Sequence, residues 1–200
     1  MAPTHRGRPP TSSREMLQDA AFDLFIENTY PKTTVDQIAQ RAGVSRATFF
    51  NYFPTKSDVF WVELDDALEL LTQELQRQST RHSPARGLHT LRQSLLHVAS
   101  RMGADRVPFA LTQAELLGST HDLQASVLTR FRSLAAVIGS FLESHGIPAA
   151  TARAAAYACL AASASAASEW AEAGTARLGL DHYLDAAIAP VINGFAASFG

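Results

Sequence analysis

The chain has 200 residues, of which 46% are hydrophobic and 18% are charged, so it can bury a core in one or two domains. Its formal net charge of -2 argues against binding polyanions through bulk charge, so contact with nucleic acid would depend on where basic residues lie. The single cysteine, Cys159, excludes an intrachain disulfide framework and is typical of a protein from the reducing cytoplasm.

The first residues, MAPTHRGRPPTSS, are basic and rich in proline, and contain no acidic residue. This composition predicts a segment that is disordered on its own. Arg6 and Arg8 belong to a narrow cationic stretch of the kind that enters an A·T-rich minor groove. The alternative is an unstructured solubilising tail, because chain termini are commonly mobile. Residues 1–10 are therefore predicted to be a disordered basic arm.

A long helix is predicted after the arm. Ser12 and Glu15 have the spacing of a capping box, in which each side chain satisfies a backbone N–H of the other residue. The helix would bury one apolar stripe, formed by Leu17, Ala21, Leu24 and Phe25.

Two short helices joined by a tight turn are predicted next. Thr34 and Gln37 form a second capping box, and Gly43 suits the positive φ that ends a helix. Ser45 is a good N-cap for the second of the two helices. The first would bury Val35, Ile38, Ala39 and Ala42, and the second would bury Phe49 and Phe53 together with Val44 of the turn.

The second short helix carries Arg46 directly after its N-cap. A short helix with an outward arginine and small neighbours fits the major groove, which is roughly 12 Å wide and displays a distinct pattern of donors and acceptors for each base pair. This arrangement predicts a helix-turn-helix DNA reader. Pro54 ends the helix, Thr55 with Asp58 restarts another, and Lys56 can reach a phosphate from its first turn.

The run IAQRAGVSRATFFNYFPTK resembles the DNA-binding signature of the TetR family of bacterial transcriptional regulators. The resemblance implies phosphate contacts from Thr34, Phe50, Tyr52 and Lys56. It implies that the residues facing base edges are Ser45, Arg46, Ala47, Thr48 and Asn51. Two positions depart from the family pattern. The family often has Gly where this chain has Ala47, and a phosphate-contacting Tyr where this chain has Phe50. Phe50 cannot donate that hydrogen bond, so its role falls to packing against a thymine methyl.

Helical periodicity continues beyond residue 60. The next helix would bury Trp61, Leu64, Leu68, Leu71 and Leu75 on one stripe. Further helices are predicted at about 88–102, 107–117 and 123–145, and Gly146 and Pro148 mark the end of the last one. That last helix has the stripe Val127, Phe131, Leu134, Ile138 and Phe141. Because no strand-like alternation occurs, the predicted fold is all-α with about nine helices, divided into a helix-turn-helix domain at 11–60 and a larger helical domain at 61–200.

The last two predicted helices have the character of an interface. Fifteen of the twenty-eight residues from 149 to 176 are alanine, which favours helix and lets a partner helix approach closely. The final helix has one apolar face, with Pro190 expected to kink it. That face comprises Leu184, Ile188, Val191, Ile192, Phe195 and Phe199. In the TetR family these helices pair with their copies, so the resemblance implies a homodimer on a pseudo-palindromic operator in double-stranded DNA. The alternative is an ordinary intramolecular helix pair.

The resemblance also implies that the central helices enclose a pocket for a small, hydrophobic effector. The candidate lining residues are Trp61, Met102, Phe109, Phe131, Tyr157 and Trp170, with His97 or Glu115 as a polar anchor. The alternative for most of them is plain core, because pockets and cores share the same apolar residues. The chain is thus interpreted as a cytoplasmic regulator, most simply a repressor that the effector releases. Its effector, operator and target genes, and the choice between repressor and activator, stay open.

Other classes of function find less support. The chain has no Gly-rich phosphate loop, nucleophile elbow or CxxC pair, and His82, His89 and His97 are seven and eight residues apart, without the i, i+4 geometry of helical zinc sites. Neither an enzyme nor a cofactor or metal is therefore predicted. Residues 154–168, the longest uncharged small-residue run, are too few to span about 30 Å of hydrocarbon, so no membrane insertion is expected. A redox-sensing regulator acting through Cys159 and a helical protein-binding scaffold remain as alternatives.

Overall fold

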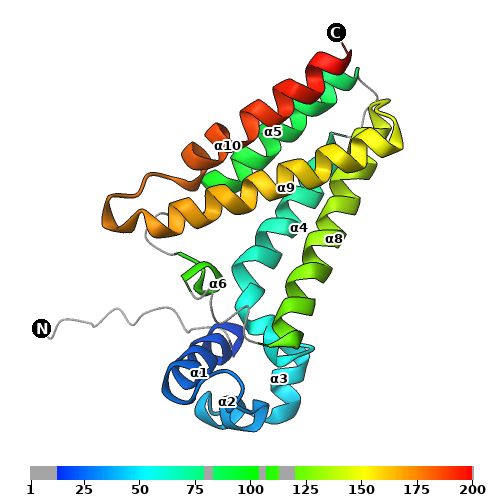
Figure 1. The fold of residues 1–200 in the computed structure, drawn as a ribbon. Helices are drawn as coiled ribbons and strands as arrows, with labels where there is room; N and C mark the ends of the chain where they lie inside the picture. The colour runs from blue at the N-terminus through cyan, green and yellow to red at the C-terminus, as the bar shows by residue number, and fades with distance from the viewer. Residues whose placement is uncertain (1–12, 79–82, 104–106, 113–119, 200) are drawn as a thin grey trace, which may run out of the picture. The chain divides into compact units, whose positions relative to one another are not determined.

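The computed structural model describes residues 13–78, 83–103, 107–112 and 120–199 (Figure 1). Nine α-helices and three short 3-10 helices occur in these ranges, and no strand does, which confirms the prediction of an all-α fold. Contacts between Cα atoms divide the chain into an N-terminal unit, Met1–Trp61, and a C-terminal unit, Val62–Gly200.

The N-terminal unit is built from short helices held by side-chain caps. Its elements are α1 (Ser13–Asn28), α2 (Val35–Arg41), α3 (Arg46–Tyr52) and the 3-10 helix η1 (Lys56–Trp61). The capping box before α2 is present, since the Thr34 hydroxyl accepts from the N–H of Gln37 at 3.3 Å and Gln37 Oε1 accepts from the N–H of Thr34 at 2.8 Å. Ser45 caps α3 by accepting from the N–H of Thr48 at 3.0 Å. Gly43 has a φ of +69°, so the predicted turn is confirmed.

The core of the N-terminal unit is largely aromatic. The predicted α1 stripe is buried, as are Phe49 of α3 and its C-cap residue Phe53, whereas Val44 of the turn is only half-buried. A cluster that the periodicity did not predict lies beside them. The Phe60 ring stacks on Phe25 with centroids 5.1 Å apart, and Tyr30 packs on both rings. Tyr30 and Phe60 lie outside the periodic stretches, so only the fold brings them to this core.

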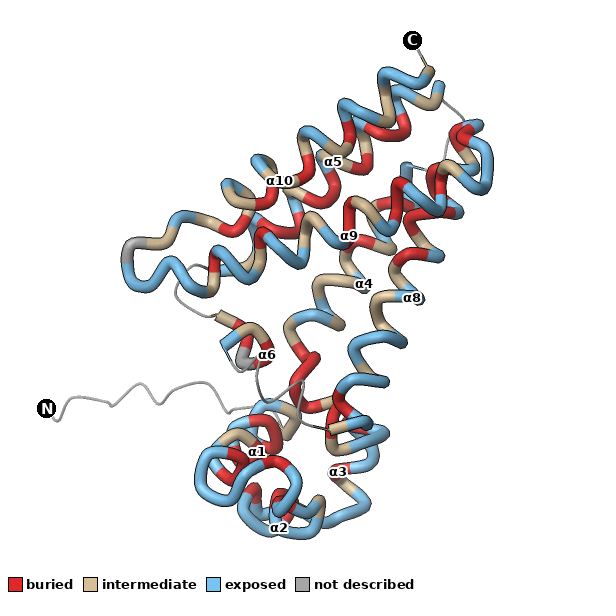
Figure 2. The backbone as a smooth tube through the Cα atoms, in the orientation of Figure 1, coloured by how far each residue is buried: buried red, intermediate tan, exposed pale blue. Residues whose placement is uncertain are grey.

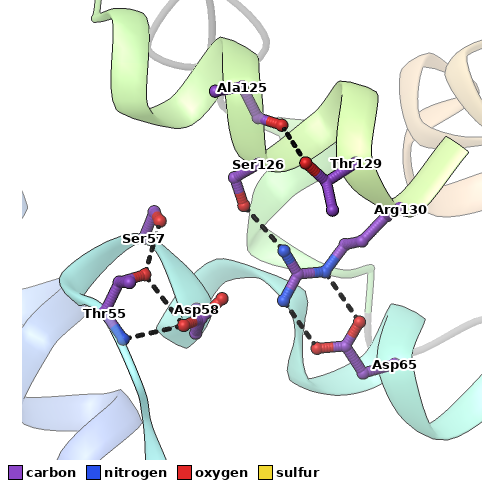
Figure 3. A network of polar contacts seen from close by, with 8 residues as sticks. All are labelled: Thr55, Ser57, Asp58, Asp65, Ala125, Ser126, Thr129 and Arg130. Carbon is purple, nitrogen blue, oxygen red and sulfur yellow. Dashed lines mark hydrogen bonds and ion pairs between the residues drawn. The ribbon is translucent and has the colours of Figure 1, made fainter. Parts of the chain in front are cut away.

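The segment after Pro54 differs from the prediction of an α-helix restarting at Thr55. Asp58 accepts from both the N–H and the hydroxyl of Thr55 at 2.8 Å, as a cap should (Figure 3). The following residues nevertheless form the 3-10 helix η1, and the α-helix begins only at Val62. Four of the six η1 residues are buried, namely Ser57, Val59, Phe60 and Trp61. A 3-10 helix spreads consecutive side chains over three directions, so it buries more of a short segment than one α-helical stripe would.

The C-terminal unit packs long helices against one another (Figure 1). Its elements are α4 (Val62–Arg77), α5 (Pro84–Ser100), α6 (Phe109–Thr112), α8 (His121–Ser144), α9 (Ala149–Glu172), η2 (Gly174–Ala176), α10 (Leu180–Ala196) and η3 (Ala197–Phe199). Helix α10 lies beside α5 and α9, and α8 lies beside α9. The buried residues line the inner faces of these helices (Figure 2). Helix α9 buries mostly small side chains there, Ala152, Ala155, Ala156 and Cys159, which allows close approach.

The helix predicted at 107–117 lies partly outside the described residues, which show only α6 there. Two predicted stripes are buried over only part of their length. In α4, Leu71 and Leu75 are buried while Leu64 is exposed. In α8, Ile138 and Phe141 are buried while Val127 is exposed. Periodicity identified the correct helix faces, but a face is buried only where another element covers it.

Helix α8 is the one described helix that is long and apolar enough to cross a membrane. This finding depends on length and composition alone. Its C-terminal half contributes Ile138, Phe141 and Leu142 to the core of the unit, and Arg130 and Arg132 lie along its middle. Core packing accounts for the apolar residues of this C-terminal half, and 28% of the apolar window is buried in all.

An ion pair joins α4 to α8 (Figure 3). Arg130 donates from Nε and Nη2 to the two carboxylate oxygens of Asp65 at 2.7 and 2.8 Å, and from Nη1 to the Ser126 hydroxyl at 2.7 Å. The Arg130 side chain is only 17% exposed. Such a two-pronged, partly buried pair fixes the orientation of both side chains. It gives the partly exposed N-terminal half of α4, where Val62 is the one buried residue, a polar attachment.

Candidate functional site

One face of α3 is exposed while the opposite face anchors the helix. Phe49 and Phe53 are buried, whereas the ring of Phe50 is 43% exposed and that of Tyr52 is 45% exposed. The residues predicted to face bases are brought together on this helix and its cap: Ser45, Arg46, Ala47 and Asn51 are exposed, and Thr48 is half-buried. The Thr48 hydroxyl lies 2.9 Å from that of Ser45, so these two polar groups also organise the first turn.

Arg46 is held by two neighbours on this surface. Its Nη1 donates to both carboxylate oxygens of Asp36, at 3.0 and 2.9 Å. Its guanidinium carbon lies 5.4 Å from the centroid of the Phe50 ring, a distance typical of a cation–π contact. Both members of the ion pair are well exposed, with Arg46 at 60% and Asp36 at 64%.

The partner of Arg46 was missed by the sequence reasoning. Asp36 lies in the first turn of α2, where the helix dipole favours an acidic residue. The dipole alone would explain an acidic residue at this position. Arg46 follows it by ten residues, across the turn at Gly43. The only available signal was opposite charge at the starts of two helices joined by a tight turn.

The predicted phosphate contacts have different surroundings from one another. Thr34 and Tyr52 are exposed, and Thr34 is already engaged as the cap of α2. Lys56 is half-buried, and its ammonium donates to the carbonyl oxygens of Tyr30 at 2.8 Å and Thr33 at 2.9 Å. The same ammonium lies 3.9 Å from the centroid of the Tyr30 ring. Lys56 therefore ties η1 to the segment before α2, a role that its sequence position did not indicate.

A second exposed ion pair ties α2 to α1. Arg41 donates to both carboxylate oxygens of Glu27, at 3.0 and 2.6 Å. The hydrogen bond from Arg41 lowers the pKa of Glu27, and the same bond raises the pKa of Arg41. The basic arm with Arg6 and Arg8, and the cap residue Ser12, lie outside the described residues.

The effector candidates on α8 and α9 do not lie in one place. Phe131 of α8 and Tyr157 of α9 stack with ring centroids 5.7 Å apart. Trp170 lies thirteen residues further along α9, about 20 Å at 1.5 Å rise per residue. It is fully buried and donates from Nε1 to the carbonyl of Leu178 at 3.0 Å. Trp61 is buried in the N-terminal unit.

Of the two predicted polar anchors and the two remaining candidates, the structure describes the side chains of His97 and Met102. His97 is exposed on α5, with its Nε2 3.2 Å from a carboxylate oxygen of Glu74 on α4. Met102 is half-buried and packs against the core of the unit. Phe109 begins α6, its side chain is not described, and Glu115 lies outside the described residues.

Two open hollows occur on the described surface of the C-terminal unit. One, of about 350 Å³, lies between α4 and α8 and includes Thr72, Gln76 and Ser140 in its lining. The other, of about 410 Å³, lies between α5 and α10 and includes Leu96, His182 and Asp185. Of the predicted effector residues whose side chains the structure describes, none lines either hollow.

The structure also describes most of the residues considered for redox sensing and metal binding. Cys159 is fully buried in α9, and burial raises the pKa of its thiol to about 11. A thiol in that state is a poor nucleophile, which disfavours redox sensing. His89 and His97 are exposed on α5, and His82 lies outside the described residues. Among the described residues, no three His, Cys, Asp or Glu side chains are grouped to hold a metal ion.

Comparison with known sequences gives matches along most of the chain. Residues 17–60 match the family model described as bacterial regulatory proteins, tetR family, and residues 86–196 match the model described as MftR C-terminal domain. The HTH-type transcriptional regulator HbdR of Aromatoleum sp. (strain CIB) is 38% identical over 65 residues, which are 32% of this chain and 28% of that protein. The putative mycofactocin biosynthesis transcriptional regulator MftR of Mycobacterium tuberculosis is 31% identical over 65 residues, 32% of this chain and 33% of that protein. The chain thus spans about a third of the length of the curated relatives that it matches.

Solved structures match over nearly the whole chain. The TetR-family repressor FadR of Thermus thermophilus, solved in complex with lauroyl-CoA, is 26% identical with a TM-score of 0.57, covering 90% of this chain and 94% of that one. FadR of Bacillus halodurans is 18% identical with a TM-score of 0.58, covering 94% of this chain and 97% of that one, and so shows the fold alone. Together the two family models match both the capped α2–α3 turn and more than half of the chain beyond it. The protein therefore belongs to the TetR family of bacterial regulatory proteins.

Proposed function

We propose that the protein is a sequence-specific DNA-binding regulator of transcription, and that it acts as a repressor which a small hydrophobic effector releases from its operator. The observation that carries the proposal is the exposed face of α3. There Arg46 and Ala47 at the start of α3 and Asn51 near its end are exposed, while Phe49 and the C-cap residue Phe53 fix the opposite side of the helix in the core. A helix anchored in this way can enter a major groove without rearrangement. The names of the relatives that match the same region support this function.

The residues on this surface divide into two roles. Ser45, Arg46, Ala47, Thr48 and Asn51 are proposed to face base edges, where an arginine can donate two hydrogen bonds to guanine. Thr34, Phe50, Tyr52 and Lys56 are proposed to lie along the phosphate backbone, together with Arg6 and Arg8 of the arm. Phosphate contacts set affinity and its salt dependence, whereas base contacts set sequence preference. Because Lys56 is held by two carbonyl oxygens, we expect it to act as a fixed positive charge near a phosphate.

A homodimer is part of the proposal, because one reader contacts few base pairs. The outward faces of α9 and α10 are lined mainly by small side chains, which would let the same two helices of a second copy pack closely. These are Ala150, Ala154, Ala161 and Ala164 on α9, and Ala186, Pro190 and Gly194 on α10. Two readers related by a two-fold axis would bind half-sites about 34 Å apart.

The effector is proposed to be hydrophobic, and an acyl-CoA is the first class to test. The support is the lauroyl-CoA bound by the Thermus thermophilus repressor, which is 26% identical over nearly the whole chain. Within this chain the stacked Phe131 and Tyr157, with the half-buried Met102, offer apolar surface that a ligand could cover. An effector that favours the DNA-incompetent state by about 1 to 3 kcal/mol would weaken DNA binding some 5 to 150-fold.

The proposal also includes that the protein works in the cytoplasm and catalyses no reaction. The alternatives fit less well, since the Cys159 thiol is buried and a protein-binding scaffold would have no need of a base-reading surface. We expect oxidant treatment to affect DNA binding by the wild-type protein and by Cys159→Ser equally. If oxidant weakened DNA binding by the wild-type protein but not by Cys159→Ser, the redox-sensing alternative would be supported instead.

The deciding experiment is selection of duplexes from a randomised pool by the purified protein. Fluorescence anisotropy on the recovered duplex and a shuffled version, at two salt concentrations, then gives the selectivity. We expect at least about a thousandfold preference for the recovered duplex, near the low end for specific regulators. Equal, strongly salt-dependent binding to both would contradict the proposal. Release of the recovered duplex by lauroyl-CoA, but not by CoA alone, would identify the effector class.

A further inference from the structure

Asp36 contacts Arg46, the arginine proposed to read bases. Asp36 occupies the first turn of α2, where the helix dipole favours a negative charge independently of Arg46. The capping box of Thr34 and Gln37 fixes the backbone at that point. The backbone of Asp36 is therefore held in place by α2 itself, and its carboxylate lies 2.9 Å from Arg46 Nη1.

Phe50 holds the other side of the guanidinium. It follows Arg46 by one helical turn, and its ring packs edge-on against the buried Phe49, with centroids 5.5 Å apart and planes at 85°. The exposed ring thus has a fixed orientation, and Arg46 lies over it at 5.4 Å. Arg46 is confined between a carboxylate and an aromatic face although 60% of its side chain is exposed.

The geometry leaves part of the guanidinium for DNA. Both contacts to Asp36 come from Nη1, so among the described residues Nη2 and Nε have no hydrogen-bond partner. Guanine presents two acceptors, O6 and N7, in one plane of the major groove, and an arginine can satisfy both. A base edge can therefore be engaged while Nη1 stays on Asp36. A phosphate that captured the arginine would have to approach the Asp36 carboxylate, which repels it.

We propose that Asp36 is a specificity-determining residue, whose carboxylate holds Arg46 over Phe50 so that the guanidinium meets a base edge rather than any phosphate. An exposed ion pair contributes little to folding stability, so the pair has more to offer as an orienting device than as a stabilising one. The inference rests on the proposed function. The Asp36 carboxylate would weaken binding to non-specific DNA by repelling phosphates, an effect that no base contact supplies.

The test uses the full-length Asp36→Asn protein with the duplex that the wild-type protein selects from a random pool and with a shuffled duplex. Removing the charge should tighten binding to the shuffled duplex about 3 to 10-fold and lower the selectivity ratio by a similar factor. The slope of log Kd against log salt should rise by about one, because Arg46 becomes available to a phosphate. Asp36→Glu, which keeps a carboxylate, should keep the ratio within about twofold of wild type.

Two controls separate this role from charge alone. Asp19→Asn removes one exposed acid from α1 of the same unit and should leave the selectivity ratio unchanged. In an Arg46→Ala background, Asp36→Asn should change the ratio less than about twofold, because the residue that it orients is gone. Circular dichroism of each variant verifies that the helices are retained.

The outcomes distinguish the two levels of the proposal. Suppose that the wild-type protein selects a common sequence. An unchanged selectivity ratio in Asp36→Asn, or an equal loss of selectivity in Asp19→Asn, would then overturn the role of Asp36 without contradicting the regulator function. A loss that persists in the Arg46→Ala background would also overturn it. If the wild-type protein selects no common sequence, the regulator function itself fails, and this inference with it.

Discussion

The two units of the molecule are held together in different ways. The N-terminal unit has short helices, an aromatic core and side-chain caps that fix the turn between α2 and α3. The C-terminal unit has long helices whose core is aliphatic and rich in alanine, with the N-terminal parts of α4 and α8 left partly exposed. Side-chain caps set the direction of a short helix, whereas long helices that pack through apolar side chains can slide past one another by small amounts. The first design suits a rigid reading surface, and the second suits a body that changes shape.

Each unit contains one of the two tryptophans, both buried, so fluorescence can follow the units separately. Trp61 reports the N-terminal unit and Trp170 the C-terminal unit. Replacing either one with Phe leaves a protein with a single reporter.

The largest effect should come from breaking the core of the C-terminal unit. Trp170→Ala removes a fully buried ring and its hydrogen bond to Leu178, and should lower the free energy of unfolding by about 3 to 5 kcal/mol. Urea titration followed by circular dichroism measures this loss. Tyr157→Ala, on the same helix but exposed, should cost much less. Equal losses in the two variants would mean that α9 is not anchored at Trp170.

The next effect should come from the ion pair between α4 and α8. Arg130→Ala leaves the Asp65 carboxylate without its two-pronged partner and should cost about 1 to 2 kcal/mol, between the values for exposed and buried pairs. Urea unfolding followed by Trp170 fluorescence measures it. Arg132→Ala, an exposed arginine on the same helix, serves as the matched control. If the two variants were equally stable, the pair would add nothing to the attachment of α4.

A cap should matter more in the N-terminal unit than a similar hydroxyl does in the C-terminal one. Thr34→Ala removes the cap of α2 and should cost about 1 kcal/mol, seen by Trp61 fluorescence in the Trp170→Phe protein. The Thr129 hydroxyl donates to the Ala125 carbonyl inside α8, and its removal should change stability little (Figure 3). Equal costs would remove the contrast between a capped and a packed unit.

The smallest effect concerns pH and the exposed pair of Glu27 and Arg41. The pKa of Glu27 is lowered in the folded protein by the hydrogen bond from Arg41. The stabilisation is therefore present above the unfolded pKa, near 4.5, and is lost as pH falls through the lower folded value. Glu27→Gln should lower the urea midpoint of the N-terminal unit slightly at pH 7 and not at pH 3. A difference that persists at pH 3 would assign the effect to packing instead.

The local features of the reading surface could be predicted from the sequence. Caps at Thr34 and Ser45, the turn at Gly43 and the buried pair Phe49 and Phe53 all follow from rules that act over a few neighbouring residues. For the same reason the sequence predicted an all-α fold and placed the long helices to within a few residues. These signals depend on backbone geometry that neighbouring residues impose, so they need no knowledge of distant contacts.

The tertiary structure alone decided which surfaces are covered and which charges meet. Leu64 and Val127 belong to correct helix faces yet are exposed, because burial needs an opposing element that no local pattern specifies. The contact between Asp36 and Arg46 requires the turn to fold two helix starts toward each other. The stacking of Phe131 of α8 on Tyr157 of α9 likewise depends on how the two helices cross. Pairings of this kind join residues far apart in the chain, and a hydrophobicity pattern contains no information about which partner each face will find.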